Sequence, residues 1–195
     1  MDVQFYKQLV REEGPAAEHL FQVLSRKFNP QRILDVGCAT GLYLRPFYKA
    51  GYDVLGWEIN AGALALSELP KGVIQLQDIT KYAGTGMRFD LVLCLETFEH
   101  IEESKAKAGI TNLCKQSNRI LFSAAIPGQS GEGHINCQKK EYWEVMFREQ
   151  GFERRKMIED ELKKEIMVGY HMGWLISNLL WLEKGESRMD PYYFV

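Results

Sequence analysis

Apolar residues in the first part of the chain recur three or four positions apart, the spacing at which side chains share one face of a helix. These residues are Phe5, Leu9, Val10, Ala16, Leu20, Phe21 and Leu24. Pro15 separates the two groups, and proline is favoured at the first position of a helix because its missing N–H has no partner there. The pattern therefore predicts two helices within residues 1–30.

From residue 31 onward, short apolar runs alternate with segments of helical periodicity. The expected strands lie near 32–36, 53–58, 72–76, 89–95 and 119–125. The expected helices lie near 42–50, 60–68, 98–115 and 139–150. This alternation is typical of a doubly wound α/β fold built around a parallel sheet.

Two further apolar runs near the C-terminus predict a closing pair of strands, at Phe152–Ile158 and Ser177–Leu182. The charged stretch Glu159–Glu165 and an aromatic turn around Tyr170–Trp174 separate them. We expect the aromatic tail Tyr192–Phe194 to pack on the edge of the sheet, since packing is the commoner use of such side chains. Closure over a substrate is the alternative for this tail.

Composition bounds the class of protein. The chain has 195 residues, of which 46% are hydrophobic and 26% charged, enough for one domain with a substantial core. The formal net charge of −2 provides no excess of Lys and Arg for binding long nucleic acids. The sequence has no run of about 18 apolar residues, and Met1–Val10 lacks a signal-peptide pattern. We expect one cytoplasmic domain over residues 1–195, with residues 31–195 as its core.

Four cysteines, Cys38, Cys94, Cys114 and Cys137, lie far apart and form no C-x-x-C pair. Paired spacing of that kind is the usual signature of a zinc or redox site. We interpret them as reduced thiols without a zinc role.

A turn of small residues follows the first predicted strand. Ile33–Gly41 runs from apolar residues into this turn, and helical periodicity resumes at Leu42. Residues with little or no side chain allow backbone N–H groups and the start of a helix to approach an anionic ligand group closely. The segment predicts a cradle for a nucleoside cofactor.

This turn resembles motif I of the class I S-adenosylmethionine-dependent methyltransferases, (D/E)-x-G-x-G-x-G. Here the motif reads Asp35, Gly37, Ala39 and Gly41, with Ala39 in place of the middle glycine. The dinucleotide fingerprint G-x-G-x-x-G requires a glycine where Leu42 stands, which disfavours NAD. The resemblance implies S-adenosylmethionine as the cofactor.

The resemblance continues along the chain. Val54–Glu58 resembles the second strand of the family, which implies that the Glu58 carboxylate holds the ribose hydroxyls. Val73–Ile79 resembles the third strand, which implies that Asp78 bonds the adenine amine and that Ile79 packs on the ring. Taken singly, Asp35 and Asp78 are also compatible with helix or turn caps, and Glu58 with a solvated surface carboxylate.

Phe89–Glu96 resembles motif IV, the strand that brings substrate beside the reactive methyl group. The cofactor-binding residues that the resemblance implies are Asp35, Gly37, Ala39, Gly41, Glu58, Asp78, Ile79 and Leu95. It also implies the family fold, a doubly wound, Rossmann-like, seven-stranded sheet that is mostly parallel and ends in an antiparallel hairpin.

Polar residues follow this fourth strand. Glu96, Glu99 and His100 are spaced i, i+3 and i+4, which places them on one face of a first helical turn at the carboxyl end of a strand. The glycine-rich loop after the fifth strand, Ile126–Asn136, can fold over the same edge of the sheet. We expect Gln129, His134 and Asn136 to lie above the cleft there.

Methyl transfer needs an aligned nucleophile and a group that removes its proton. Histidine suits the second task, and we expect His134 to be the general base, with His100 as the competing candidate. The alternative is that both are ordinary histidines satisfied by neighbouring backbone.

Two carboxylates and two imidazoles also suit a divalent ion, Mg²⁺ or Mn²⁺, bound by Glu96, Glu99, His100 and His134. The Glu-x-x-Glu-His element with a distant His resembles the metal-binding motif of small-RNA terminal 2′-O-methyltransferases. It also resembles the equivalent stretch of ubiquinone-pathway O-methyltransferases. Many small-molecule relatives share the element without a metal, so metal binding stays an open expectation.

The sequence thus predicts an S-adenosylmethionine-dependent O-methyltransferase acting on a hydroxyl of a small molecule or sugar. One alternative is a metal-dependent 2′-O-methyltransferase of RNA 3′ ends, to which the basic region Arg148, Arg154, Arg155 and Lys156 could contribute a groove. Another is a noncatalytic module that keeps the cofactor cleft.

Overall fold

The structure, a computed structural model, describes residues 3–82, 84, 86–168 and 173–185. The aromatic tail Tyr192–Phe194 and residues 170–172 of the expected aromatic turn lie outside the described residues. The last two residues of that turn, 173 and 174, begin a helix.

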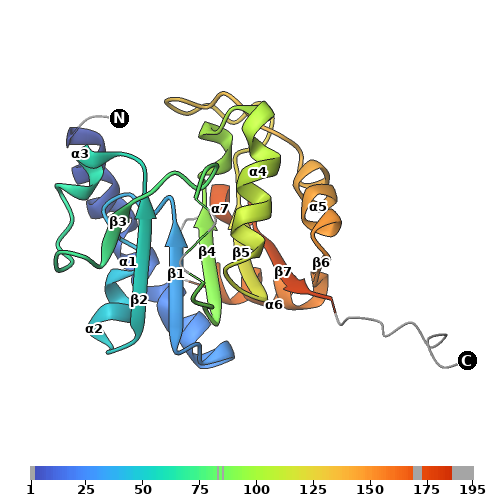
Figure 1. Cartoon of the computed structure of the whole chain (residues 1–195). Coiled ribbons are helices and arrows are strands. Elements are labelled where there is room, and N and C mark those ends of the chain that lie inside the picture. The colour runs from blue at the N-terminus through green and yellow to red at the C-terminus, as the bar shows by residue number, and fades with distance from the viewer. Residues whose placement is uncertain (1–2, 83, 85, 169–172, 186–195) are drawn as a thin grey trace, which may run out of the picture.

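A seven-stranded sheet in the order β3-β2-β1-β4-β5-β7-β6 forms the centre of the molecule (Figure 1). Its strands are β1 (Arg32–Val36), β2 (Asp53–Glu58), β3 (Ile74–Leu76), β4 (Leu91–Leu95), β5 (Arg119–Ser123), β6 (Phe152–Arg154) and β7 (Leu180–Lys184). The first five are parallel, whereas β7 runs antiparallel to both β5 and β6. This arrangement confirms the predicted doubly wound sheet with a C-terminal antiparallel pair. The pair is not a simple hairpin, because helical residues 156–166 and 173–178 lie between β6 and β7, and the strand expected at Ser177–Leu182 begins only at Leu180.

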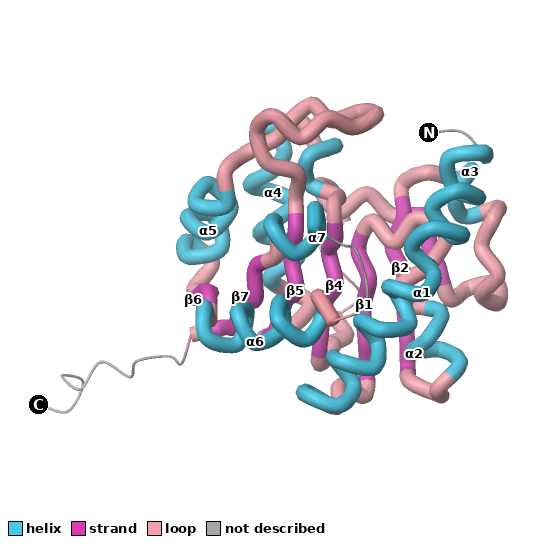
Figure 2. Tube along the Cα trace, turned by 180° about the vertical axis from the view of Figure 1, so that it is seen from behind, coloured by secondary structure: helices cyan, strands magenta, loops and turns pink. Residues whose placement is uncertain are grey.

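Helices cover both faces of the sheet. They are α1 (Val3–Phe28), α2 (Arg45–Lys49), α3 (Ala61–Leu64), the 3₁₀ turn η1 (Phe98–His100), α4 (Glu103–Cys114), α5 (Lys140–Glu149), α6 (Lys156–Ile166) and α7 (Gly173–Asn178). Helices α4 and α5 lie in front of the sheet in Figure 1, and α1, α2, α6 and α7 lie in front of it when it is seen from behind in Figure 2.

Both faces of the central strands are therefore buried. In β1, Leu34 packs in the core layer of α4 and α5, while Ile33 packs in the layer of α1 and α6. Strands covered on both faces are apolar throughout rather than alternating, which is why the strands were visible in the sequence as continuous apolar runs. Among the described residues, no helix has the length and apolar character needed to cross a membrane.

The prediction of two N-terminal helices was wrong, because α1 is a single helix with Pro15 inside it. Proline removes one backbone hydrogen bond and disturbs the preceding turn. The carbonyl that loses its partner belongs to Arg11, which is exposed, as is Pro15, so this carbonyl can bind water. Ala16, Leu20 and Leu24 are buried against the sheet, and this packing continues the helix through the proline.

The predicted strand Phe152–Ile158 was too long, and the charged stretch after it is helical. Strand β6 ends at Arg154, and α6 begins at Lys156. Leu162 and Ile166 lie one turn apart and are fully buried, so this stretch has an apolar helical face among its charges. The predicted helix near 98–115 is likewise divided into η1 and α4.

Candidate active site

A cavity of about 900 Å³ opens at the carboxyl ends of β1, β2 and β4. One part is lined by the turn after β1 and by Glu58 at the end of β2; we call it the glycine-turn half. The other part is lined by residues 96–100 after β4 and by residues 129–135 of the loop after β5; we call it the histidine half. Ligands of open α/β sheets bind at this edge.

The glycine turn has the backbone that its small residues allow. Gly37, Ala39 and Gly41 have φ values of 75°, 49° and 79°, in the left-handed region that disfavours a side chain. A Cβ at Gly37 would overlap with the Thr97 hydroxyl, and one at Gly41 would lie 2.6 Å from Leu69 Cδ1. Gly37 and Ala39 line the cavity, whereas Gly41 faces a small hollow behind the turn.

Glu58 connects the turn to the second strand. Its carboxylate accepts hydrogen bonds from the backbone N–H groups of Ala39 (2.8 Å) and Asn60 (2.7 Å), one on each oxygen. The side chain is 8% exposed and lines the cavity. A carboxylate has about four acceptor positions, so Glu58 retains acceptors for a ligand after it has fixed the turn.

Asp35 lies beneath the turn and also lines the cavity. Burial raises the pKa of its carboxyl to about 8, and the nearby charge of Glu58 adds to the shift. The protonated form is therefore favoured below about pH 8. A cation in the cavity would favour the ionised form.

Asp78, Ile79 and Leu95 all line the cavity, as predicted. The Asp78 carboxylate caps its own turn, accepting from the Thr80 N–H (2.9 Å) and hydroxyl (2.6 Å), and it pairs with Lys81. Its pKa is lowered, because these partners outweigh the opposing effect of burial. The turn-cap interpretation of Asp78 is thus correct, whether or not the residue also binds a ligand.

In the histidine half, Glu96 and Glu99 have different surroundings. Asn178 on α7 donates from Nδ2 to both Glu96 oxygens (3.2 Å each) and to Gln129 Oε1 (2.9 Å). The Glu99 side chain is fully buried, and neither of its oxygens has a hydrogen-bond partner among the described residues. Burial and the neighbouring Glu96 raise the pKa of Glu99 to about 8.

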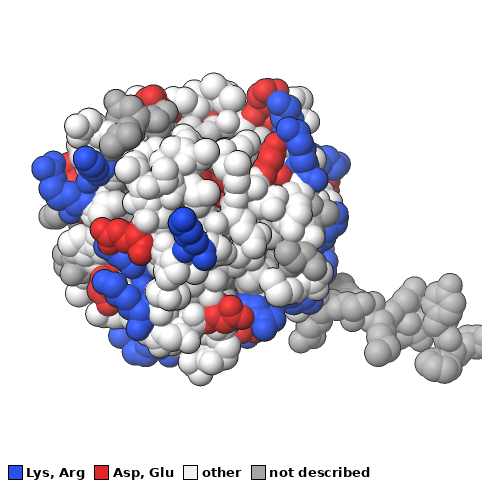
Figure 3. All heavy atoms as spheres, turned by 60° about the vertical axis from the view of Figure 1, so that its left-hand side comes forward, with Lys and Arg blue, Asp and Glu red and all other residues white. Residues whose placement is uncertain are grey.

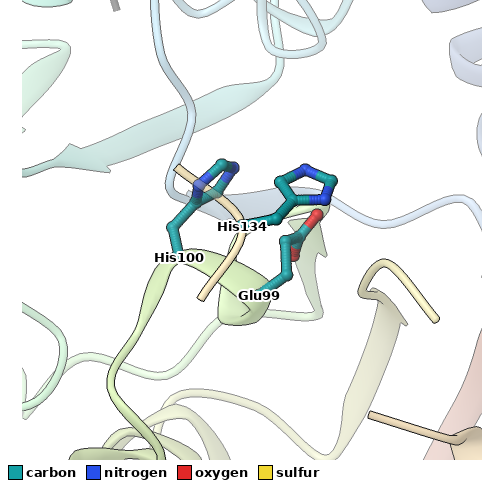
Figure 4. Close-up of side chains that lie close together, drawn as sticks. All are labelled: Glu99, His100 and His134. Carbon is teal, nitrogen blue, oxygen red and sulfur yellow. The ribbon is translucent and has the colours of Figure 1, made fainter. Parts of the chain in front are cut away.

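The two imidazoles lie beside Glu99, with ring centroids 5.0 Å apart (Figure 4). His100 donates from Nδ1 to the backbone carbonyl oxygen of Gly133 (3.0 Å). Nδ1 of His134 lies 3.2 Å from the backbone carbonyl oxygen of Gln129. Burial lowers the pKa of His100. One donor atom from each of Glu99, His100 and His134 lies within 4.8 Å of the other two.

The loop after β5 is held onto η1 by the backbone. The carbonyl oxygen of Glu99 accepts from the N–H groups of Ile135 and Asn136, both at 2.9 Å. These bonds bring His134 to the cavity, as predicted, together with Gln129. Asn136 was expected above the cleft, but its side chain is buried and does not line the cavity.

The four cysteines are free, and the group of donor atoms in the described residues that could hold a metal contains none of them.

Sequence reasoning missed three polar residues at or beside the site: Asn178, Asn60 and Tyr6. Asn178 is described above, and Asn60 donates from its side chain to the Tyr6 hydroxyl (3.1 Å), which brings α1 to the cavity. No local pattern marks these residues, because each partner is distant along the chain.

Comparisons with known proteins identify the family and the fold of the chain. Residues 10–122 match the family described as "Methyltransferase domain". The ubiquinone biosynthesis O-methyltransferase of Alkalilimnicola ehrlichii is 30% identical over 101 residues, which are 48% of this chain and 41% of that protein. The match therefore spans about two fifths of that curated relative.

Two solved structures share the fold. The amino pentose methyltransferase CalS10 from Micromonospora echinaspora, solved with S-adenosylmethionine bound, superposes with a TM-score of 0.68 at 17% identity, covering 94% of this chain and 98% of that one. The sugar N-methyltransferase KedS8 from a Streptoalloteichus species has a TM-score of 0.64 at 14% identity, covering 80% and 86%.

Proposed function

The chain belongs to the methyltransferase-domain family, and from this membership we propose that it transfers a methyl group from S-adenosylmethionine to a hydroxyl of a small molecule or sugar. One observation carries the proposal. A single cavity contains the glycine turn with Glu58 at one end and the two imidazoles at the other, so that a cofactor and an acceptor can meet inside it.

The glycine-turn half is the proposed cofactor site. Glu58 would accept hydrogen bonds from the ribose hydroxyls with the acceptor positions that the backbone leaves free. Asp78 and Ile79 would contact the adenine, and Leu95 would pack beside the reacting end. Gly41 would act indirectly, because it lies behind the turn and allows the turn to pack against Leu69.

In the proposed reaction, the acceptor oxygen attacks the methyl carbon, the carbon–sulfur bond breaks, and S-adenosylhomocysteine leaves. His134 takes the proton of the hydroxyl. When its Nδ1 carries the ring proton and donates to Gln129, the lone pair is on Nε2 and can accept that proton. His100 has a similar arrangement through Gly133 and is the second candidate.

The charge of the cavity supports an uncharged or cationic acceptor. Its lining includes nine acidic side chains and one lysine: Glu12, Glu13, Asp35, Glu58, Asp78, Glu96, Glu99, Glu102, Glu132 and Lys105. The names of similar proteins, with sugar and ubiquinone-pathway acceptors, agree with a small acceptor.

The same charges oppose the RNA alternative, because phosphates would enter an acidic cavity. Three of the four basic residues considered for RNA are also paired: Arg148 with Glu144, Arg154 with Glu144 and Glu159, and Arg155 with Glu153 and Glu183. Lys and Arg on the face shown in Figure 3 are interspersed with Asp and Glu.

Two measurements on the wild type and His134→Ala test the proposal. Calorimetric titration with S-adenosylhomocysteine should give saturable binding of similar affinity in both proteins, because His134 lies in the histidine half. Methyl transfer to a panel of hydroxylated sugars and phenols should fall about 10²- to 10⁴-fold in the variant, the usual contribution of a general base. Absence of cofactor binding in the wild type would refute the proposal. Binding without transfer to any acceptor would favour the noncatalytic module.

A further inference from the structure

The carboxylate of Glu99 is the least satisfied polar group in the cavity. Its side chain is fully buried, and both of its oxygens lack a hydrogen-bond partner among the described residues. Buried polar side chains almost always have a partner, so an exception needs an explanation, such as an ion that binds there. Figure 4 shows this carboxylate directed toward the ring of His134, with the His100 ring to the left of both.

Two imidazoles complete the surroundings of this carboxylate. One donor atom from each of Glu99, His100 and His134 lies within 4.8 Å of the others. Donors that bind one ion at about 2.0–2.2 Å are at most about twice that distance apart, so a small rotation of the side chains would bring all three to one ion. The Nδ1–H of His100 bonds a backbone carbonyl, and a bond of this kind orients metal-binding histidines.

We propose that Glu99, His100 and His134 form a binding site for one divalent transition-metal ion. Two nitrogen donors and one carboxylate favour Mn²⁺, Fe²⁺, Co²⁺ or Zn²⁺ over Mg²⁺, which prefers oxygen ligands. The set differs from the four residues expected from the sequence, because Glu96 does not belong to the group of mutually close donors. Asn178 holds the Glu96 carboxylate instead.

Three protein ligands leave positions for other groups on the ion. The proposed metal binding depends only on the geometry of the three side chains. The role of the ion in catalysis rests on the proposed function: an open position on the ion would hold the acceptor oxygen next to the methyl group. A histidine bound to the ion cannot also take a proton with the same lone pair. In the metal-loaded protein, His134 and His100 would therefore be ligands and not bases. The ion would lower the pKa of the bound acceptor hydroxyl, whose proton would pass to solvent water.

The experiment uses the full chain after removal of metals with a chelator. Titration with Co²⁺, followed by its visible absorption, should show one ion per chain, displaced by Zn²⁺ and not by equimolar Mg²⁺. Glu99→Gln and His134→Ala should each weaken Co²⁺ binding more than about 100-fold, beyond the 10- to 100-fold typical of residues that only support ligands. Glu96→Gln should have a smaller effect, within that supporting range.

Glu102→Gln is the matched control. It makes the same chemical change on a carboxylate that lines the same cavity but pairs with Lys105, and Co²⁺ affinity should stay within about threefold of the wild type, because no ligand is lost. Circular dichroism and S-adenosylhomocysteine titration show that each variant is folded.

The inference is overturned if the folded wild type binds S-adenosylhomocysteine but not Co²⁺, or if Glu99→Gln binds Co²⁺ as well as the wild type. Equal losses in Glu96→Gln and Glu99→Gln would overturn the three-residue set in favour of four. Failure to bind S-adenosylhomocysteine, with Co²⁺ binding intact, would refute the proposed function and leave the metal site standing.

Discussion

Glu58 and Glu99 are two buried glutamates that line the same cavity. They differ in the hydrogen bonds that their carboxylates accept from the rest of the protein. Glu58 accepts two backbone hydrogen bonds, from Ala39 and Asn60. Glu99 accepts none with its side chain among the described residues. The Glu58 carboxylate stabilises the turn through these two bonds, whereas the Glu99 carboxylate is desolvated without a hydrogen bond of comparable geometry in the described part of the chain.

This difference extends to the two halves of the cavity. The chain completes the glycine-turn half by itself, because the turn, the strand ends and Glu58 bond one another. The histidine half is brought together by a loop, by η1 and by α7, and it leaves an acid unsatisfied. We infer that the interactions of the glycine-turn half increase the free energy of unfolding. We also infer that the unsatisfied acid of the histidine half lowers this free energy and is retained because it binds a ligand.

The largest effect is expected at the turn itself. Gly37→Ala requires φ of 75° from an alanine and places a methyl group against Thr97, so it should lower the free energy of unfolding by about 3 kcal/mol. Binding of S-adenosylhomocysteine should fall more than about 100-fold, because a displacement of 1 Å at a site has effects of that size. Urea unfolding and calorimetry measure the two quantities.

Gly51→Ala is the matched control for this change. Gly51 has a φ of 86°, but a Cβ there would meet nothing within 4 Å. Its cost should be the backbone strain alone, about 1 kcal/mol, without loss of cofactor affinity. Equal losses in the two variants would show that strain, and not the contact with Thr97, determines the behaviour of the turn.

The comparison of the two glutamates is tested directly by the same substitution in each. Glu58→Gln replaces a charged acceptor of two backbone bonds and should lower the free energy of unfolding by about 2 kcal/mol and weaken S-adenosylhomocysteine binding. Glu99→Gln removes a buried acid that has no partner, so stability should be unchanged or higher. Parallel urea titrations of both variants at one pH measure the free energy of unfolding. A larger loss of this free energy in Glu99→Gln than in Glu58→Gln would contradict the proposed difference between the two halves.

Asp35 also lies in the glycine-turn half. Whereas backbone N–H groups donate to the carboxylates of Glu58 and Asp78 in this half, burial dominates the behaviour of the Asp35 carboxyl. Because burial raises its folded-state pKa to about 8 from 3.8, its contribution to stability is complete below about pH 4 and is lost as the pH rises to about 8. Asp35→Asn should therefore unfold like the wild type at pH 4. It should be more stable than the wild type by at least about 1 kcal/mol at pH 8.

The stability difference between Asp35→Asn and the wild type, measured by urea unfolding from pH 4 to pH 9, checks this sign. Other acids with raised pKa values, Glu99 among them, affect both proteins and cancel in the difference. A difference that shrinks as the pH rises would show that Asp35 is ionised in the folded protein.

The glycine-turn half was predictable because its residues are close in sequence. Asp35 to Gly41 form one continuous segment, and Glu58 ends the next strand, so apolar runs and small residues were sufficient. The five parallel strands were equally visible, because burial on both faces makes them apolar throughout.

The rest depends on distant contacts. Glu96 and Asn178 are 82 residues apart, and no periodicity connects them. The single helix α1 depends on packing of Ala16 and Leu20 against the sheet, which outweighs the local tendency of Pro15 to begin a helix. The spacing of Glu96, Glu99 and His100 predicted one cluster, whereas the group of mutually close donor atoms in the described residues joins Glu99 and His100 with the distant His134 and does not include Glu96.

The smallest expected effect concerns the one departure from the family's glycine pattern. Ala39 has a φ of 49°, which costs an alanine about 1 kcal/mol relative to glycine, while glycine loses more entropy on folding. Ala39→Gly should therefore change the free energy of unfolding by less than about 1 kcal/mol. Its backbone N–H still donates to Glu58, so cofactor affinity should stay within about threefold. Asn29→Gly also introduces glycine at a left-handed residue, with a φ of 42° and outside the cavity, and serves as the control for urea unfolding. If Ala39→Gly alone lost cofactor affinity, the methyl group would be a contact with the ligand, and the turn would recognise its cofactor with more than backbone.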